Sequence, residues 1–264
     1  MKTSLITGMV LMFLLHTPFV FLNSLSTDAD DFMIDELGNI YLIHNTYIER
    51  INAVGGNKFR TSELSYGNIE YFDVTNPLKP FIHYRSQGKI ILFDNTLSEQ
   101  GNVDLFSRGY EQIEFVCGSR GDAYWLWDSR NSELIRVDQN FVRIASTGNI
   151  SVLTNNQIMP EQILERGSSV YLRDEETGIL IFDNYGSYRT TLNIPTNTDI
   201  QVVNDEIIFE KEGHIHVIGK DLISESIYEL PGTAALRVHF FNQTLYDLEP
   251  GSLNTWGLKE NARN

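Results

Sequence analysis

The sequence predicts an all-β fold, a single β-propeller of six blades with four antiparallel strands in each. Short apolar strands bounded by turn residues recur at steps of 37 to 46 residues along the 264-residue chain. A regular period in this range is typical of propellers and related repeat arrays. No window shows the apolar periodicity of a long amphipathic helix. Aromatic residues are abundant, with 12 Tyr and 15 Phe, which suits half-buried pleated surfaces.

The repeating unit is clearest in its second strand, a short run of apolar residues. The six second strands are expected at 40–43, 80–83, 123–126, 170–172, 207–209 and 245–246. A third strand follows in the first five units, at 48–51, 90–94, 134–138, 179–183 and 215–218. Turn residues such as Gly, Asn and Asp separate the strands. The units therefore span 30–64, 66–108, 110–150, 160–196, 198–232 and 234–260.

The N-terminus has the features of an export signal. Lys2 precedes an apolar run from Leu5 to Leu15, and the small residues at Ser24–Ser26 suit a cleavage site. The predicted organisation is therefore a signal peptide over 1–26 and a propeller over 27–264. A retained membrane anchor is the alternative, although Pro18 interrupts the run before it reaches the roughly 18 to 20 residues that a membrane span needs.

The last unit ends without sequence for a fourth strand. Closed propellers often take that strand from the other terminus, which removes an exposed sheet edge. The candidate segment is Phe19–Leu25, so we hypothesise that part of 19–25 is retained and closes the ring. N-terminal sequencing of the mature protein tests this hypothesis, and a start at Thr27 or later would contradict it.

The charge of the chain restricts its partners. It carries 20 Lys and Arg against 35 Asp and Glu, a net charge of −15. Nucleic acid is excluded because its phosphates require a basic surface, and anionic membranes are disfavoured for the same reason. We expect membrane association to be peripheral or through a partner. The expected partners are envelope proteins with basic patches, and the expected location is the periplasm or the outer-membrane periphery.

Buried roles are expected for the single cysteine and for most of the tryptophans. Cys117 cannot form an intramolecular disulfide, and its apolar surroundings suit a small buried side chain. Tyr124, Trp125 and Trp127 lie together in the third unit, and Trp256 lies in the last. Both faces of a blade pack against neighbours, so these rings are expected in the core.

Acidic residues recur at the start of the innermost strand, which opens onto the central channel of a propeller. The residues at this position are Asp30 and Asp31, Glu70, Glu111, Glu161, Asp199 and Arg237. Converging carboxylates are the ligands that Ca²⁺ prefers. The candidate metal ligands are therefore Asp31, Glu70, Glu111, Glu161 and Asp199, and no other cofactor is expected. The alternative is that acids are common in this chain and gather at turns by chance.

The remaining residue patterns give weaker evidence for a metal site or for catalysis. His214 and His216 lie two apart on a predicted strand and share a face, as two Zn²⁺ ligands would. No third ligand is indicated by spacing, and a hairpin edge explains the pair equally well. No nucleophile elbow, phosphate-binding loop or dinucleotide motif occurs. The motifs therefore give no support for catalysis, and they leave open whether the protein is an enzyme.

The first unit resembles the NHL-type propeller repeat. Residues 34–43 read Ile-Asp-Glu-Leu-Gly-Asn-Ile-Tyr-Leu-Ile, and Ile-Glu-Arg-Ile follows at 48–51, close to the NHL pattern VDxxGNIYVAD and its later RI pair. His44 stands where that pattern has Asp. Most of residues 30–230 also resembles a group of short exported propellers of Gram-negative bacteria, through segments 35–43, 76–79, 92–99 and 176–183. This resemblance implies a propeller and export, and it implies no activity.

These observations favour a non-catalytic, exported propeller that acts as a protein-interaction scaffold in a cell-envelope complex. Loops of a rigid ring offer wide faces to partners, and the candidate contact residues are Arg120, Asp122, Trp127, Asp174 and Glu175. The alternative is a metal-dependent hydrolase. Six-bladed lactonases and phosphotriesterases hold metal with Glu, Asp and Asn side chains in their channels, and the Asn partners are not obvious here. A glycan-binding module is a third reading.

Overall fold

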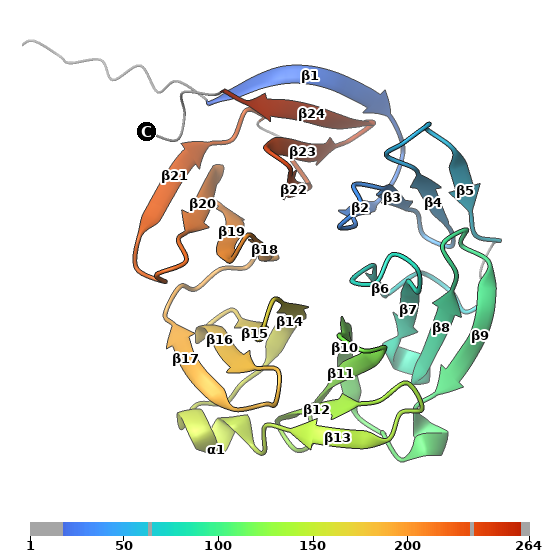
Figure 1. Ribbon diagram of the computed structural model, residues 1–264, viewed down its shortest axis with the longest axis vertical. Helices are drawn as coiled ribbons and strands as arrows, with labels where there is room; N and C mark the ends of the chain where they lie inside the picture. The colour runs from blue at the N-terminus through green and yellow to red at the C-terminus, as the bar shows by residue number, and fades with distance from the viewer. Residues whose placement is uncertain (1–17, 63–64, 233–234, 260–264) are drawn as a thin grey trace, which may run out of the picture.

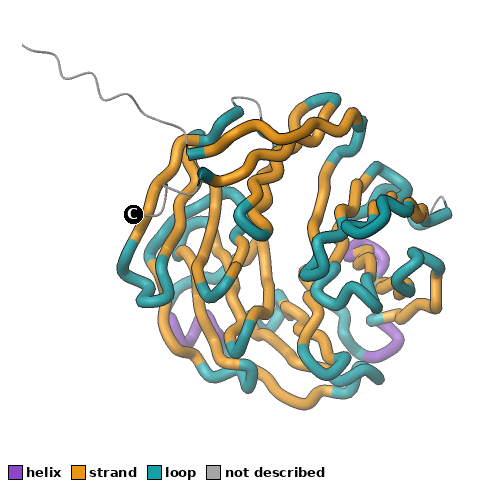
Figure 2. The backbone as a smooth tube through the Cα atoms, turned by 45° about the horizontal axis from the view of Figure 1, so that its top comes forward, coloured by secondary structure: helices purple, strands orange, loops and turns teal. Residues whose placement is uncertain are grey.

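A computed structural model describes residues 18–62, 65–232 and 235–259, and it confirms the prediction of six blades. Six antiparallel sheets of four strands each stand around a central axis (Figure 1). The tilted view in Figure 2 shows that strands and short loops make up nearly all of the ring. No helix in the described ranges is long and apolar enough to cross a membrane.

Blades 1 to 3 follow one another along the chain, each as a meander from the inner to the outer strand. Blade 1 contains β2 (Asp31–Ile34), β3 (Ile40–Ile43), β4 (Ile48–Ile51) and β5 (Lys58–Arg60). Blade 2 contains β6 (Tyr71–Asp73), β7 (Phe81–Tyr84), β8 (Lys89–Phe93) and β9 (Glu99–Asp104). Blade 3 contains β10 (Ile113–Ser119), β11 (Ala123–Asp128), β12 (Glu133–Val137) and β13 (Arg143–Ser146).

Blades 4 and 5 repeat this order, and blade 6 departs from it. Blade 4 contains β14 (Pro160–Arg166), β15 (Ser169–Asp174), β16 (Gly178–Asp183) and β17 (Tyr188–Leu192). Blade 5 contains β18 (Gln201–Val203), β19 (Glu206–Lys211), β20 (His214–Ile218) and β21 (Glu225–Glu229). Blade 6 contains β22 (Arg237–Phe241), β23 (Thr244–Glu249), β24 (Ser252–Leu258) and the N-terminal strand β1 (Phe19–Ser26).

A recurring aspartate explains why the third strands end alike in sequence. Asp94, Asp138 and Asp183 each follow or end a third strand, and each carboxylate accepts the backbone N–H groups two and four residues later. Such side-chain bonds fix a tight turn at little cost in chain entropy. The repeated aspartate therefore sets the turn into the outer strand.

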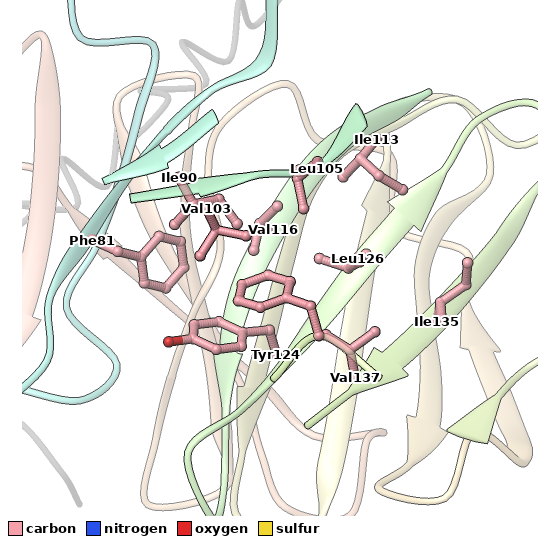
Figure 3. Close-up of a cluster of buried hydrophobic side chains, with 11 residues drawn as sticks. Phe81, Ile90, Val103, Leu105, Ile113, Val116, Tyr124, Leu126, Ile135 and Val137 are labelled. Carbon is pink, nitrogen blue, oxygen red and sulfur yellow. The ribbon is translucent and has the colours of Figure 1, made fainter. Parts of the chain in front are cut away.

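The core consists of apolar layers between neighbouring blades. Figure 3 shows the layer between blades 2 and 3, where Phe81 and Ile90 of blade 2 face Val116, Tyr124 and Leu126 of blade 3. Side chains alternate along each strand, so both faces of a blade contribute to such layers. Trp125 and Trp127 are fully buried in the next layer, together with Cys117. The expected core positions of these residues are thus confirmed.

Within the described residues, helical structure is limited to three short segments. α1 (Ile150–Thr154) lies between blades 3 and 4, and 3-10 turns occupy Arg85–Gln87 and Phe106–Arg108. The Asn149 side chain caps α1 by accepting the Val152 N–H, and Ile150 is buried. The sequence analysis did not predict α1, because five residues are too few to show a helical period.

The ring closes through pairing between the two ends of the described chain. β1 runs antiparallel to β24, from Phe19 opposite Leu258 to Ser26 opposite Ser252, as the blue and red strands of Figure 1 show. Phe19 is 5% exposed and packs with the blade 5 and 6 core. In this full-length chain the segment named in the closure hypothesis is therefore the outer strand of blade 6.

We predict that Phe19 contributes to stability far more than its neighbour Phe21. Phe19→Ala should lower the free energy of unfolding by about 3 kcal/mol, because it opens a cavity in the core. Phe21 is 52% exposed, so Phe21→Ala should cost about 1 kcal/mol or less. Urea titration of the two full-length variants checks this, and equal small losses would show that β1 does not pack as described.

Candidate functional site in the central channel

The six inner strands enclose a channel with a cavity of about 1020 Å³. Each inner strand begins on one face of the ring and runs to the other, because the first three strands of all six blades follow one another from the inside outward. We call the face where the inner strands begin the start face. The turns between first and second strands surround the opposite mouth. A propeller therefore gathers residues at matching positions of distant repeats into one ring.

The structure places three of the five predicted metal ligands on the cavity wall. Asp31, Glu70 and Asp199 line it, whereas Glu111 and Glu161 lie outside its lining. Glu70 accepts the Ser86 hydroxyl at 2.6 Å. Glu111 forms an ion pair with Arg130 at 3.2 Å, with both side chains largely exposed.

Three of the predicted acids are joined by two arginines into one chain of ion pairs, Glu161–Arg173–Asp199–Arg237–Asp31. Arg237 donates Nη1 to Asp199 at 2.6 Å, and its Nε lies 2.5 Å from Asp31. Arg173 lies 3.4 Å from Asp199 and also contacts Glu161. These residues come from blades 4, 5, 6 and 1, so the chain crosses three blade boundaries.

Burial and ion pairing together set the charge states of Asp31 and Arg237. Burial raises the pKa of Asp31 to about 6, and the Arg237 cation limits the rise. Burial alone would lower the pKa of Arg237, but the carboxylates of Asp31 and Asp199 outweigh it and raise that pKa. Arg237 therefore stays charged, and the two carboxylates share its charge.

A second polar group lies in the same cavity, formed by Tyr71, Asp73, Arg166 and His239. Burial raises the pKa of the Tyr71 hydroxyl and lowers the pKa of His239 to about 3, so both are neutral at pH 7. Arg166 donates to the Thr75 hydroxyl at 3.4 Å. Burial also raises the pKa of Asp73. The group therefore presents the Arg166 cation, the Asp73 carboxyl and two neutral rings to the channel.

Every pair of adjacent blades is joined by a polar contact near the channel. In blade 4, Glu165 accepts the Trp125 indole N–H of blade 3 at 2.7 Å, and Asp73 of blade 2 accepts the Gly118 N–H of blade 3 at 3.3 Å. The Ile69 N–H donates to the Asn45 carbonyl between blades 2 and 1. With the chain of ion pairs, these contacts form what we call the inter-blade belt.

The predicted contact residues do not form one surface. Trp127 is 1% exposed and Asp174 is 3% exposed, so neither is available to a partner and that expectation was wrong for both. Trp127 packs in the core, and Asp174 accepts the Met159 N–H at 2.7 Å. Their surface assignment failed because Trp127 is the last residue but one of β11 and Asp174 ends β15. Sequence alone does not show whether a side chain so close to a turn lies inside or outside.

The remaining contact candidates lie on opposite faces. Arg120 and Asp122 stand in the β10–β11 turn, where Asp122 pairs with Lys79 at 2.6 Å. Arg120 lies 3.5 Å from Glu165 and is largely exposed. Glu175 is exposed in the β15–β16 turn on the start face.

The two histidines on β20 have separate partners. His214 Nδ1 lies 3.0 Å from the Glu212 carbonyl, and His216 Nδ1 lies 2.7 Å from Glu225. His216 also stacks on Phe209. Among residues 18–62, 65–232 and 235–259, no three His, Cys, Asp or Glu side chains come together as a metal-binding group.

Sequence reasoning missed Arg173, Glu165 and Tyr71. Arg173 directly follows the apolar run 170–172 and is buried. A charged residue at the end of an otherwise buried strand is a signal for a paired, buried charge, and it would have found this residue. Tyr71 and Glu165 carry no such signal, because only the folded ring shows that they face the channel or a neighbouring blade.

Comparison with known proteins gives the fold. The sequence matches no family model and no curated protein. Solved propellers are similar in structure at low sequence identity. BamB from Moraxella catarrhalis is 9% identical with a TM-score of 0.58, over 93% of this chain and 99% of that one. Inactive H270A virginiamycin B lyase from Staphylococcus aureus, solved with quinupristin, is 13% identical with a TM-score of 0.58, over 86% and 79%.

A third neighbour is much longer than this protein. PorZ of Porphyromonas gingivalis is 12% identical with a TM-score of 0.51, over 93% of this chain and 38% of that one. The three neighbours differ in function, and at these identities the likeness concerns the fold alone.

We predict that the buried arginine of the ion-pair chain matters more than an exposed one. Arg173 is 4% exposed, whereas Arg130 is 59% exposed, and each pairs with a glutamate. Arg173→Met should lower the unfolding free energy by about 2 to 3 kcal/mol, because Glu161 and Asp199 lose a buried counter-charge and keep only partial contact with water.

The matched variant is Arg130→Met, which should cost less than about 1 kcal/mol. Urea titrations of both variants at neutral pH give the comparison. Equal costs would show that the chain of ion pairs does not hold the blades together.

Proposed function

We propose that the protein is a non-catalytic interaction scaffold in a complex of the cell envelope, and that its start face receives a basic surface of a partner. The observation that supports this most is the placement of acids on that face. Five of the six blades carry a carboxylate at or beside the start of the inner strand. The exposed carboxylates among them, in a chain of net charge −15, attract a cationic patch and speed its association.

The state of the channel acids favours a scaffold over a metal-dependent hydrolase. Asp31, Asp199 and Glu161 are already paired with arginines, and a metal ion would have to displace those cations. Glu70 and Glu111, with their own contacts to Ser86 and Arg130, remain exposed on the start face. Both side chains are accessible to a partner and lie outside the chain of ion pairs.

The envelope location rests on several observations of different kinds. The N-terminal sequence has the features of an export signal, and the resemblance to short exported propellers of Gram-negative bacteria agrees with it. PorZ, a neighbour in structure, is a surface component of a bacterial secretion system. On these grounds we place this protein in the periplasm or at the outer-membrane periphery.

The test compares two pairs of acids. The tagged full-length protein is purified from gently solubilised envelopes, and the proteins that accompany it are identified by mass spectrometry. A stoichiometric partner is expected with the wild type. The double variant Glu70→Gln/Glu111→Gln should weaken its binding about tenfold, equivalent to about 1.4 kcal/mol, and raised salt should have the same effect.

The control removes two charges away from the start face, with Glu36→Gln/Glu99→Gln, and it should leave binding unchanged. Equal binding by both double variants would contradict the role of the start face. A protein without a partner whose melting temperature rises with Ca²⁺ or Zn²⁺ would instead support the hydrolase, because ligands that bind only the native state stabilise it.

A further inference from the structure

The outer edge of blade 6 differs from the other five outer edges because it carries no charge. β1 reads Phe-Val-Phe-Leu-Asn-Ser-Leu-Ser. Each other outer strand holds charged residues: Lys58 and Arg60 in β5, Glu99 and Asp104 in β9, Arg143 in β13, Arg189 in β17, and Glu225 and Glu229 in β21. Charges on edge strands are a common means of preventing edge-to-edge pairing. Blade 6 lacks this protection.

The edge is also long and apolar. β1 has 8 residues, whereas the other outer strands have between 3 and 6. Val20, Phe21 and Leu22 are consecutive and are 48%, 52% and 59% exposed. In an antiparallel sheet, the N–H and C=O groups on one side of a strand bond to one neighbour and those on the other side bond to the other neighbour. An edge strand therefore presents a row of N–H and C=O groups outward. These are the properties of a strand that accepts another strand.

One irregularity limits how the edge pairs. A bulge between Phe21 and Asn23 divides β1 into two regular runs. Each run is at least as long as β5, which has 3 residues and still pairs with β4. The bulge therefore restricts the register of an added strand without preventing its addition.

We propose that β1 pairs antiparallel with β1 of a second copy of this chain, about a two-fold axis. Two sheets of four strands would then become one continuous sheet of eight. The charge distribution of the chain favours the β1 edge as the place where a second copy binds. Two molecules of net charge −15 repel each other over most of their surfaces, whereas two β1 edges meet without any like-charge contact.

The geometry of the ring agrees with this pairing. A two-fold axis brings the same residues of both copies together, so one apolar edge is enough to form the interface. β1 lies on the outer perimeter of the ring (Figure 1), so the dimer leaves both mouths of the channel open. The proposal is independent of the scaffold function, because it uses neither the channel nor the start face.

The test places one charge on the edge. Val20→Lys in the full-length protein should raise the dissociation constant of the dimer at least about tenfold, since the change occurs on both sides of the axis. The control is Ile227→Lys on β21, where the side chain is 55% exposed. It makes the same kind of change on an outer strand that already carries charge. Light scattering with size-exclusion chromatography measures the mass over a range of protein concentrations.

A dimer for the wild type and the control, and a monomer for Val20→Lys with an unchanged melting temperature, is the expected result. A wild-type monomer would overturn the proposal. A Val20→Lys protein that remains dimeric would also overturn it, because the association would then involve another surface.

A cross-linking experiment tests the two-fold symmetry separately. The single native cysteine, Cys117, is buried, so a cysteine introduced on β1 is the reactive thiol. Of Leu22→Cys, Asn23→Cys and Ser24→Cys, the variant nearest the axis should give a disulfide-linked dimer on mild oxidation, since only residues near the axis meet their own copies. Ile227→Cys should give no disulfide-linked dimer. Cross-linking of Ile227→Cys alone would contradict the assignment of the edge.

Discussion

The inter-blade belt is the constraint on which the rest of this structure depends. Apolar layers alone allow neighbouring sheets to slide, because packing is not directional. Hydrogen bonds and ion pairs have defined geometry and fix each blade against the next. Arg237 shows this most clearly, because it contacts Asp199 of blade 5 and Asp31 of blade 1 from its own position in blade 6. Together with β1 at the perimeter, it closes the ring at both its inner and its outer radius.

The ion pairs change the role that the channel acids are assigned. Carboxylates at matching positions of repeated units suggest a metal centre when they are read from the sequence. In the folded ring, Asp31, Asp199 and Glu161 are bound to arginines that come from the same ring of positions or from the adjacent strand. Through these ion pairs the three acids join neighbouring blades. Glu70 and Glu111 lie outside this chain of ion pairs, and their exposed carboxylates on the start face are available to other molecules.

The architecture could be predicted from the sequence, whereas the contacts of the site could not. The difference has a physical cause. Strand pairs and the aspartate turns at Asp94, Asp138 and Asp183 are local features that repeat, so the period reveals them. The contacts of Glu165 with Trp125 and of Arg237 with Asp31 join residues 40 and 206 positions apart. Such pairs arise only when the ring closes, and no spacing rule in one sequence indicates them. α1 was missed because five residues between blades 3 and 4 are too few to show a helical period.

The central claim is that channel acids hold the blades together, and a double-mutant cycle on the closing ion pair tests it most directly. Unfolding free energies are measured for the wild type, Asp31→Asn, Arg237→Met and the double variant. We expect a coupling energy of about 1 to 2 kcal/mol between the two positions, because Arg237→Met leaves Asp31 without its arginine and Asp31→Asn removes one of the two carboxylates that contact Arg237. Additive effects, together with a stabilisation by Ca²⁺ that Asp31→Asn abolishes, would contradict it and would show that the channel acids serve a metal ion.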